Sequence, residues 1–119
     1  MIDIQITTTI QISEQRVLDI LTTAREGGID YWADTRHTKR NEQHDVISFE
    51  CVDNEDDAAE WVEVNSDTIV KGITLLLNGN KEHHTSLRCE LLKGEDGDYD
   101  AGDADVIVQY GLFGELVFS

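Results

Sequence analysis

The most suggestive chemistry in the sequence is a run of aspartates between Asp96 and Asp105. Calcium is bound by several oxygen ligands that converge from a turning loop, and closely spaced aspartates can supply them. When the run is aligned as an EF-hand loop that begins at Asp96, the turn glycine is replaced by Ala101 and the bidentate glutamate by Ile107. The spacing therefore favours a solvated acidic loop, with a weak cation site as the alternative.

Histidines and cysteines offer a second kind of chemistry, either a zinc site or a nucleophile. His83 and His84 are adjacent, so on an extended chain they point to opposite faces, and neither Cys51 nor Cys89 has another ligand at zinc-binding spacing. The chain contains no Gly-x-Ser-x-Gly motif and no glycine-rich phosphate loop. We therefore predict no metal, no cofactor and no catalytic residue, and we interpret both cysteines as buried free thiols.

Charge is the most unusual property of the composition. The chain of 119 residues has 25 Asp and Glu against 9 Lys and Arg, which gives a net charge of −16. Such a protein is not expected to bind nucleic acid or anionic membrane directly, because both are recognised through basic side chains. Three explanations remain, which are solubility, adaptation to high salt and attraction of a basic partner.

The acidic side chains are concentrated in two segments that contain no basic residue. Eight lie between Glu50 and Asp67, and six lie between Gly94 and Asp105. Closely spaced carboxylates can present to a basic groove a field like that of duplex DNA, which carries one charge per ~1.7 Å of its axis. An ordinary solvated surface is the competing interpretation. The partner-binding acidic face that we predict consists of Asp53, Glu55, Asp56, Asp57, Glu60, Glu63, Asp96, Asp98, Asp100 and Asp103.

The first third of the chain predicts a strand, a helix and a loop. Isoleucines occupy alternate positions from Ile2 to Ile12, with Thr8 in the series, and this period predicts a strand with one buried face. Ser13 is a suitable N-cap for an amphipathic helix over about residues 13–26, packed on that strand and ended by a left-handed exit at Gly27-Gly28. Residues 34–45 are polar and predict a loop.

A hairpin and two further elements are predicted after residue 45. Residues 46–52 and 61–64 read as strands joined through the acidic turn at 53–57. Ser66 or Asn65 caps a helix that ends at Asn78-Gly79. The alternation of Leu87, Cys89 and Leu91 suggests a short strand.

A loop at residues 94–103 and a C-terminal helix complete the expected elements. Asp103 is the expected N-cap of that helix, and Gly111 and Gly114 would share one of its faces and let another backbone approach. The aromatic residues Tyr31, Trp32 and Trp61 lie in apolar runs, so packing in the core is favoured over an exposed binding spot.

The N-terminus, Met1-Ile2-Asp3, lacks the basic region of a secretory signal. No apolar run approaches the ~20 residues that a membrane span needs. We therefore expect a soluble protein of the cytoplasm.

Three stretches together resemble a group of small uncharacterised proteins encoded by bacteriophages and prophages. They are residues 21–32 (LTTAREGGIDYW), residues 69–73 (IVKGI) and residues 103–115 (DADVIVQYGLFGE). The resemblance implies an accessory protein of a virus or mobile element that works inside a host cell. It carries no catalytic residue or cofactor with it, and the acidic turn at 53–57 lies outside the matched stretches.

These observations predict a single α+β domain over residues 1–119, with a small, mostly antiparallel sheet packed with two or three helices. The favoured function is that of a non-enzymatic acidic protein that binds a basic protein surface. With the resemblance, this becomes a DNA-mimicking inhibitor of a host nucleic-acid-binding defence protein, such as an anti-CRISPR or anti-restriction protein. The alternatives are a small assembly protein that forms homo-oligomers through its C-terminal segment, and a halophilic domain whose acidity is salt adaptation alone.

Overall fold

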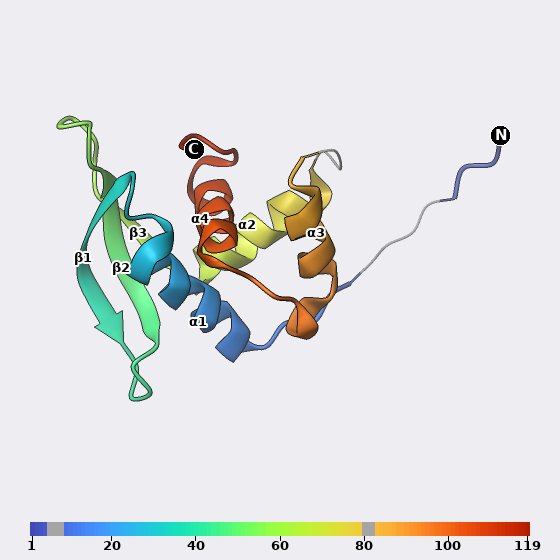
Figure 1. Ribbon diagram of the computed structural model, residues 1–119, viewed down its shortest axis with the longest axis horizontal. Coiled ribbons are helices and arrows are strands. Elements are labelled where there is room, and N and C mark those ends of the chain that lie inside the picture. The colour runs from blue at the N-terminus through green and yellow to red at the C-terminus, as the bar shows by residue number, and fades with distance from the viewer. Residues whose placement is uncertain (5–8, 80–82) are drawn as a thin grey trace.

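Three strands form one side of the molecule and helices form the other (Figure 1). The computed structural model describes residues 1–4, 9–79 and 83–119. The helices cover one face of the sheet, on which Phe49, Cys51 and Val64 are buried. The predicted α+β class with a small antiparallel sheet is therefore confirmed.

The sheet has the order β1-β2-β3, and both neighbouring pairs are antiparallel. Its strands are β1 (Ala33–Arg40), β2 (Val46–Asp53) and β3 (Val62–Asn65). The predicted hairpin of β2 and β3 is confirmed, with Phe49 opposite Val64. The prediction of a loop at 34–45 is wrong, because most of that segment is β1. As an edge strand, β1 is held by main-chain hydrogen bonds to β2, so it forms without a run of apolar side chains.

The described residues contain four α-helices and two shorter helical turns. The α-helices are α1 (Glu14–Thr23), α2 (Ser66–Asn78), α3 (Thr85–Leu92) and α4 (Ala101–Phe113). A π-helical turn, η1 (Ala24–Gly28), extends α1, and a 3₁₀ turn, η2 (Gly94–Asp96), follows α3. None of these helices combines the length and the apolar character that crossing a bilayer requires.

Side-chain caps start three of the helices. The Ser13 hydroxyl accepts a hydrogen bond from the Arg16 N–H at 3.0 Å, as predicted. Asn65, one of the two predicted candidates, caps α2. The N-cap predicted for α4, Asp103, lies three residues too late in the sequence. Asp100 is the N-cap, and Asp103 is its capping-box partner.

Two local predictions in the helical part are wrong. The segment predicted as a short strand is helix α3, because the four-residue spacing of Leu87 and Leu91 fits either period and both side chains are buried on one helix face. Gly28 does not provide a left-handed exit. It is buried, and a Cβ at this position would lie 2.8 Å from the carbonyl oxygen of Ala101, so its role is to let α4 approach η1.

The N-terminal strand is also absent from the residues that the structure describes. Ile2 and Ile4 are 87 % and 80 % exposed, and residues 1–4 lie far from the sheet (Figure 1). Ile10 and Ile12 pack against the core without forming a strand, so α1 packs on β2 instead of on an N-terminal strand. The middle of the predicted strand, residues 5–8, lies outside the described residues. Alternation makes a strand only where a neighbouring strand supplies hydrogen bonds.

Candidate functional site

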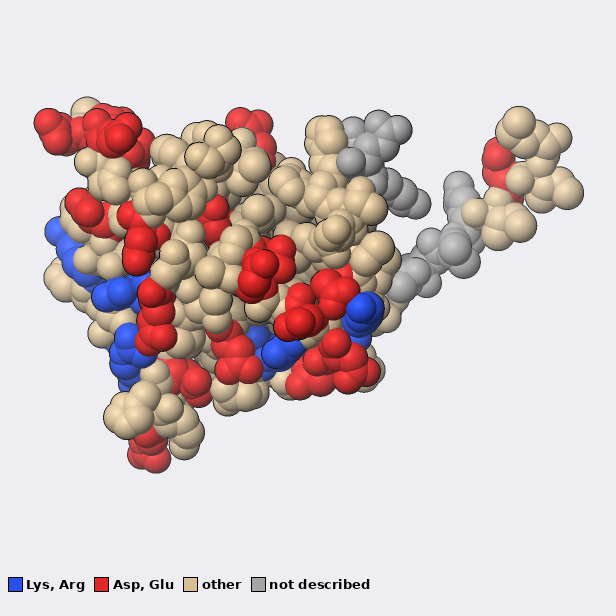
Figure 2. All heavy atoms as spheres, viewed as in Figure 1, with Lys and Arg blue, Asp and Glu red and all other residues tan. Residues whose placement is uncertain are grey.

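The loop between β2 and β3 projects beyond the sheet and carries the largest group of predicted acidic residues. The Asp53 carboxylate accepts a hydrogen bond from the Glu55 N–H at 2.9 Å, and that of Asp56 accepts one from the Ala58 N–H at 3.0 Å. Acidic atoms gather at this tip in Figure 2. We call six residues the acidic hairpin: Asp53, Glu55, Asp56, Asp57, Glu60 and Glu63.

No basic side chain forms an ion pair with the acidic hairpin in the part of the chain that the structure describes. The ion pairs found there are Arg36–Glu50, Arg40–Glu26 and Lys93–Glu90, and Glu50 is also in hydrogen-bond contact with the His37 ring. Five of the hairpin acids are exposed and Asp53 is half-buried. Their charge is therefore balanced only by solvent and mobile ions.

The uncovered face of the sheet continues this acidic surface. Arg36, Glu50 and Glu63 are successive cross-strand neighbours on β1, β2 and β3. The Arg36 Nε donates to Glu50 Oε1 at 2.9 Å, and hydrogen bonds from Arg36 and then His37 hold the pKa of Glu50 below its ordinary value. Glu63 has only the carboxylate of Glu50 opposite it, and like charges in such positions repel each other.

Only one of the three aromatic residues predicted for the core is in it. Trp32 is 3 % exposed, as expected, whereas Tyr31 is 52 % exposed. Trp61 shares the uncovered sheet face with Glu63, and the Arg36 guanidinium lies 4.0 Å from the centre of its ring. The apolar neighbour Val62 does not predict burial of Trp61, because successive side chains of a strand point to opposite faces.

The second predicted acidic group does not join the hairpin. Asp96, Asp98 and Asp100 lie between α3 and α4, and Asp103 lies in the first turn of α4. This is the helical side of the molecule, whereas the acidic hairpin extends from the sheet (Figure 1). Two of these residues also have a structural role, because Asp100 and Asp103 form the capping box of α4. Burial raises the pKa of Asp103. The two predicted halves of the acidic face are thus separate surfaces.

Asp105, grouped by sequence with the solvated loop, is in fact buried and organises a polar centre. It is 5 % exposed and accepts hydrogen bonds from Tyr31 Oη at 2.6 Å, from Trp32 Nε1 at 2.8 Å and from Gln109 Nε2 at 2.9 Å. Although much of the Tyr31 side chain is exposed, partial burial, followed by the bond to Asp105, raises the pKa of Tyr31 to about 12. The only local signal for this centre was the helical spacing of Asp105 and Gln109.

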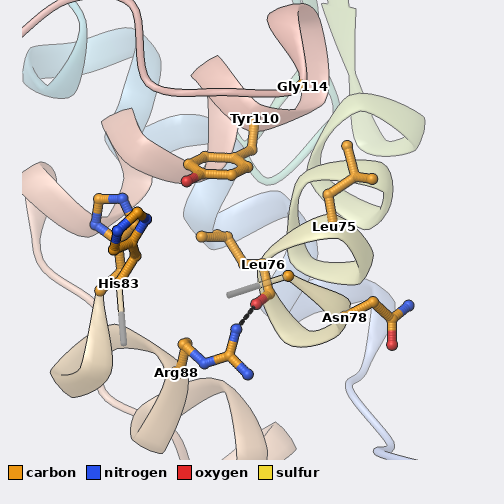
Figure 3. A pocket seen from close by; sticks show the side chains of 9 residues that line it. Leu75, Leu76, Asn78, His83, Arg88, Tyr110 and Gly114 are labelled. Atoms are coloured by element: carbon orange, nitrogen blue, oxygen red, sulfur yellow. Dashed lines mark hydrogen bonds between the residues drawn. The ribbon is translucent and has the colours of Figure 1, made fainter. Parts of the chain in front are cut away.

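The described ranges contain no cluster of three His, Cys, Asp or Glu side chains that could hold a metal ion. His83 and His84 instead border a pocket of about 330 Å³, together with Leu76 and Tyr110 (Figure 3). Burial lowers the pKa of His84. The Arg88 guanidinium at the pocket wall donates to the Leu76 and Leu77 carbonyl oxygens, so it closes the end of α2 instead of being free for a ligand.

The two thiols differ, contrary to the prediction that both are buried. Cys51 of β2 is fully buried on the helix-covered face of the sheet, and burial raises the pKa of its thiol to about 12. Cys89 is exposed on α3, because it points away from the face that buries Leu87 and Leu91. The environment of Cys51 is therefore not that of an activated thiolate, which lies near cations or a helix N-terminus.

Comparisons with protein-family models, with curated proteins and with solved structures found no match to this chain. The resemblance to phage-encoded proteins therefore stays a prediction. What the geometry itself offers is an acidic hairpin on one side and a polar centre around Asp105 on another.

Proposed function

We propose that this chain is a non-enzymatic acidic binding protein whose acidic hairpin occupies a basic groove of a partner protein. The observation that supports the proposal is the uncompensated charge of the hairpin: its six carboxylates have no ion-pair partner in the described ranges of the chain. A groove that binds nucleic acid holds lysines and arginines spaced for phosphates, and such a groove would supply the missing cations.

The repulsion between Glu50 and Glu63 on the sheet would be relieved by a basic partner. Glu50 already has hydrogen bonds to Arg36 and His37, while Glu63 on the next strand has no ion-pair partner among the described residues. A basic side chain placed beside Glu63 would turn a repulsive contact into an attractive one. Because the hairpin acids are solvated, their main effect is on the rate of association, which long-range attraction raises at low salt.

The hairpin carries the proposal without the second acidic group. Asp96, Asp98, Asp100 and Asp103 lie on a separate surface and contribute only to the long-range field. With the predicted phage context, the partner would be a nucleic-acid-binding defence protein in the cytoplasm of a host cell. The hairpin would then compete with DNA for that protein's groove.

The test uses a hairpin variant with four neutral substitutions, Asp53→Asn, Asp56→Asn, Asp57→Asn and Glu60→Gln. The Asn side chains keep an oxygen that can accept the bonds from the Glu55 and Ala58 N–H groups, so the turns are retained. Immobilised wild-type protein is exposed to lysate, and the bound proteins are eluted with short duplex DNA and with graded salt. Binding should fade above ~0.15 M salt, where the screening length falls to ~8 Å.

A charge-matched control separates the hairpin from net charge. It neutralises four exposed acids elsewhere, through Asp3→Asn, Glu14→Gln, Asp30→Asn and Glu42→Gln. The proposal expects a DNA-displaceable partner on the wild type and the control, and at least about tenfold weaker binding by the hairpin variant. Equal binding by all three proteins, or an equal loss in both variants, would show that the acidity serves solubility or salt adaptation.

A further inference from the structure

The segment after α4 folds back onto the polar centre around Asp105 and is held there by its main chain. Gln109 Oε1 accepts hydrogen bonds from the N–H groups of Val117 at 2.9 Å and Phe118 at 2.8 Å. Gln109 Nε2 donates to the Phe118 carbonyl oxygen at 3.1 Å. The side-chain amide of Gln109 thus forms hydrogen bonds with the main chain of an extended segment, as a neighbouring strand would.

A single side chain of this segment enters an aromatic slot. The Phe118 ring stacks on Trp32, with ring centres 4.5 Å apart and planes 4° from parallel. The Phe113 ring meets Phe118 edge to face, with centres 6.0 Å apart. Stacked and edge-on contacts of this kind are favourable beyond the area that they bury.

Asp105 fixes the groups that make these contacts. It accepts from the Trp32 ring N–H and from Gln109 through the same oxygen, and from Tyr31 through the other. Tyr31 Oη also lies 3.3 Å from the Phe118 carbonyl oxygen. Gln109 is fully buried and Asp105 nearly so, so the slot is built from rigid, hydrogen-bonded parts.

The occupant itself is attached at few points. Gly114 ends α4 in a left-handed conformation (φ 75°), and residues 113–117 are exposed. Leu116 and Val117 are 37 % and 52 % exposed, although both are apolar. Phe118 and the bonds to Gln109 therefore supply most of the attachment.

We propose that Trp32, Asp105 and Gln109 form a binding site for an extended peptide segment of a partner protein that carries an aromatic side chain, and that residues 115–119 occupy this site in cis. The hydrogen bonds of Gln109 with the segment are made to main-chain groups, so peptides of many sequences can form them. Specificity for an aromatic side chain comes from the slot beside Trp32. Exposed Tyr31 and Phe113 form an apolar rim for the rest of the peptide. A tethered segment competes at an effective concentration of the order of mM, so the partner must displace it.

The experiment uses a capped peptide with the sequence of residues 115–119, Glu-Leu-Val-Phe-Ser, and the full-length chain with Phe118→Ala. This variant loses the aromatic anchor of the tethered segment and should expose the slot. Peptide binding is measured by anisotropy of a fluorescent label and by the NMR shift of the Trp32 ring N–H, with the Trp61 ring N–H as internal reference. The variant should bind at least about tenfold more tightly than the wild type, in which the slot is filled.

Two controls test how the peptide is read. The same peptide with Ala in place of Phe should not bind to the Phe118→Ala chain. Adding Gln109→Ala to that chain should weaken binding at least about tenfold, whereas Gln43→Ala, the same change at an exposed turn, should leave it unchanged. A folded Phe118→Ala chain that binds no peptide at ~1 mM, the scale of the tethered competitor, would overturn the proposal.

A measurement on the wild type keeps the test independent of the variant's folding. The Val117 and Phe118 N–H groups should exchange with solvent much faster than the N–H of buried Val108 in α4, because the segment leaves the site without global unfolding. Equal exchange rates would show that the segment is a fixed part of the core, and the proposal would then be wrong.

Discussion

Gly72 of α2 is in direct contact with the carbonyl group of Ile107 in α4, so closely that no side chain fits between the two helices. Gly111 of α4 makes the reciprocal contact with the Thr68 backbone of α2. The close backbone approach expected at Gly111 is thus made within the chain. Gly114, expected to share in it, instead caps the end of α4.

Gly72→Ala should lower the free energy of unfolding, because the new methyl group must displace a helix backbone. The expected loss is about 1–3 kcal/mol, even though alanine favours a helix over glycine by ~1 kcal/mol. Gly27→Ala is the matched control, since a Cβ there meets nothing within 4 Å. Urea unfolding monitored by circular dichroism measures both, and equal stability of the two variants would disprove the close packing.

Asn65→Ala should destabilise the protein by about 1 kcal/mol through loss of the α2 cap. The Asn65 oxygen accepts bonds from the Asp67 and Thr68 N–H groups at 2.9 and 3.4 Å. Asn54→Ala, at an exposed position of the acidic hairpin loop, serves as the control and should change stability little. Thermal melting of the two variants distinguishes a cap from a surface amide, and an undiminished melting temperature for Asn65→Ala would contradict the assignment.

Tyr31 should make stability depend on pH at high pH. Its pKa is raised from 10.0 to about 12 by burial and by the bond to Asp105, so the folded state favours the neutral phenol. This contribution is complete below pH 10 and is lost as the pH rises from 10 to about 12. The stability of the wild type should therefore fall toward that of Tyr31→Phe over this range, as measured by urea unfolding at each pH. A constant difference between the two proteins would refute the assignment.

The two cysteines should react differently with a thiol reagent such as a chromogenic disulfide. Exposed Cys89 should be modified within minutes in the folded protein, whereas Cys51, buried and with its pKa raised to about 12, should react only on unfolding. The expected native stoichiometry is one thiol per chain. Cys89→Ser should abolish the fast reaction, and fast modification that persists in this variant would show that Cys51 is accessible.

Features that depend on neighbours in the chain were predictable from the sequence. The Ser13 and Asn65 caps, the β2–β3 hairpin and the helix after Asn65 follow from hydrogen bonds and periodicities within a few residues. The exposure of the hairpin tip follows from its composition, because five consecutive polar residues at 53–57 have no apolar surface to bury.

Features that depend on distant partners were decided by the tertiary structure. The alternating isoleucines look like a strand, yet residues 1–4 have no strand beside them, while polar β1 forms because β2 offers its hydrogen bonds. Asp105 resembles its acidic neighbours in sequence, but α4 turns it toward Trp32, more than 70 residues away along the chain. A local pattern states what a residue can do, whereas burial and pairing are set by which surfaces meet, and that is a property of the whole fold.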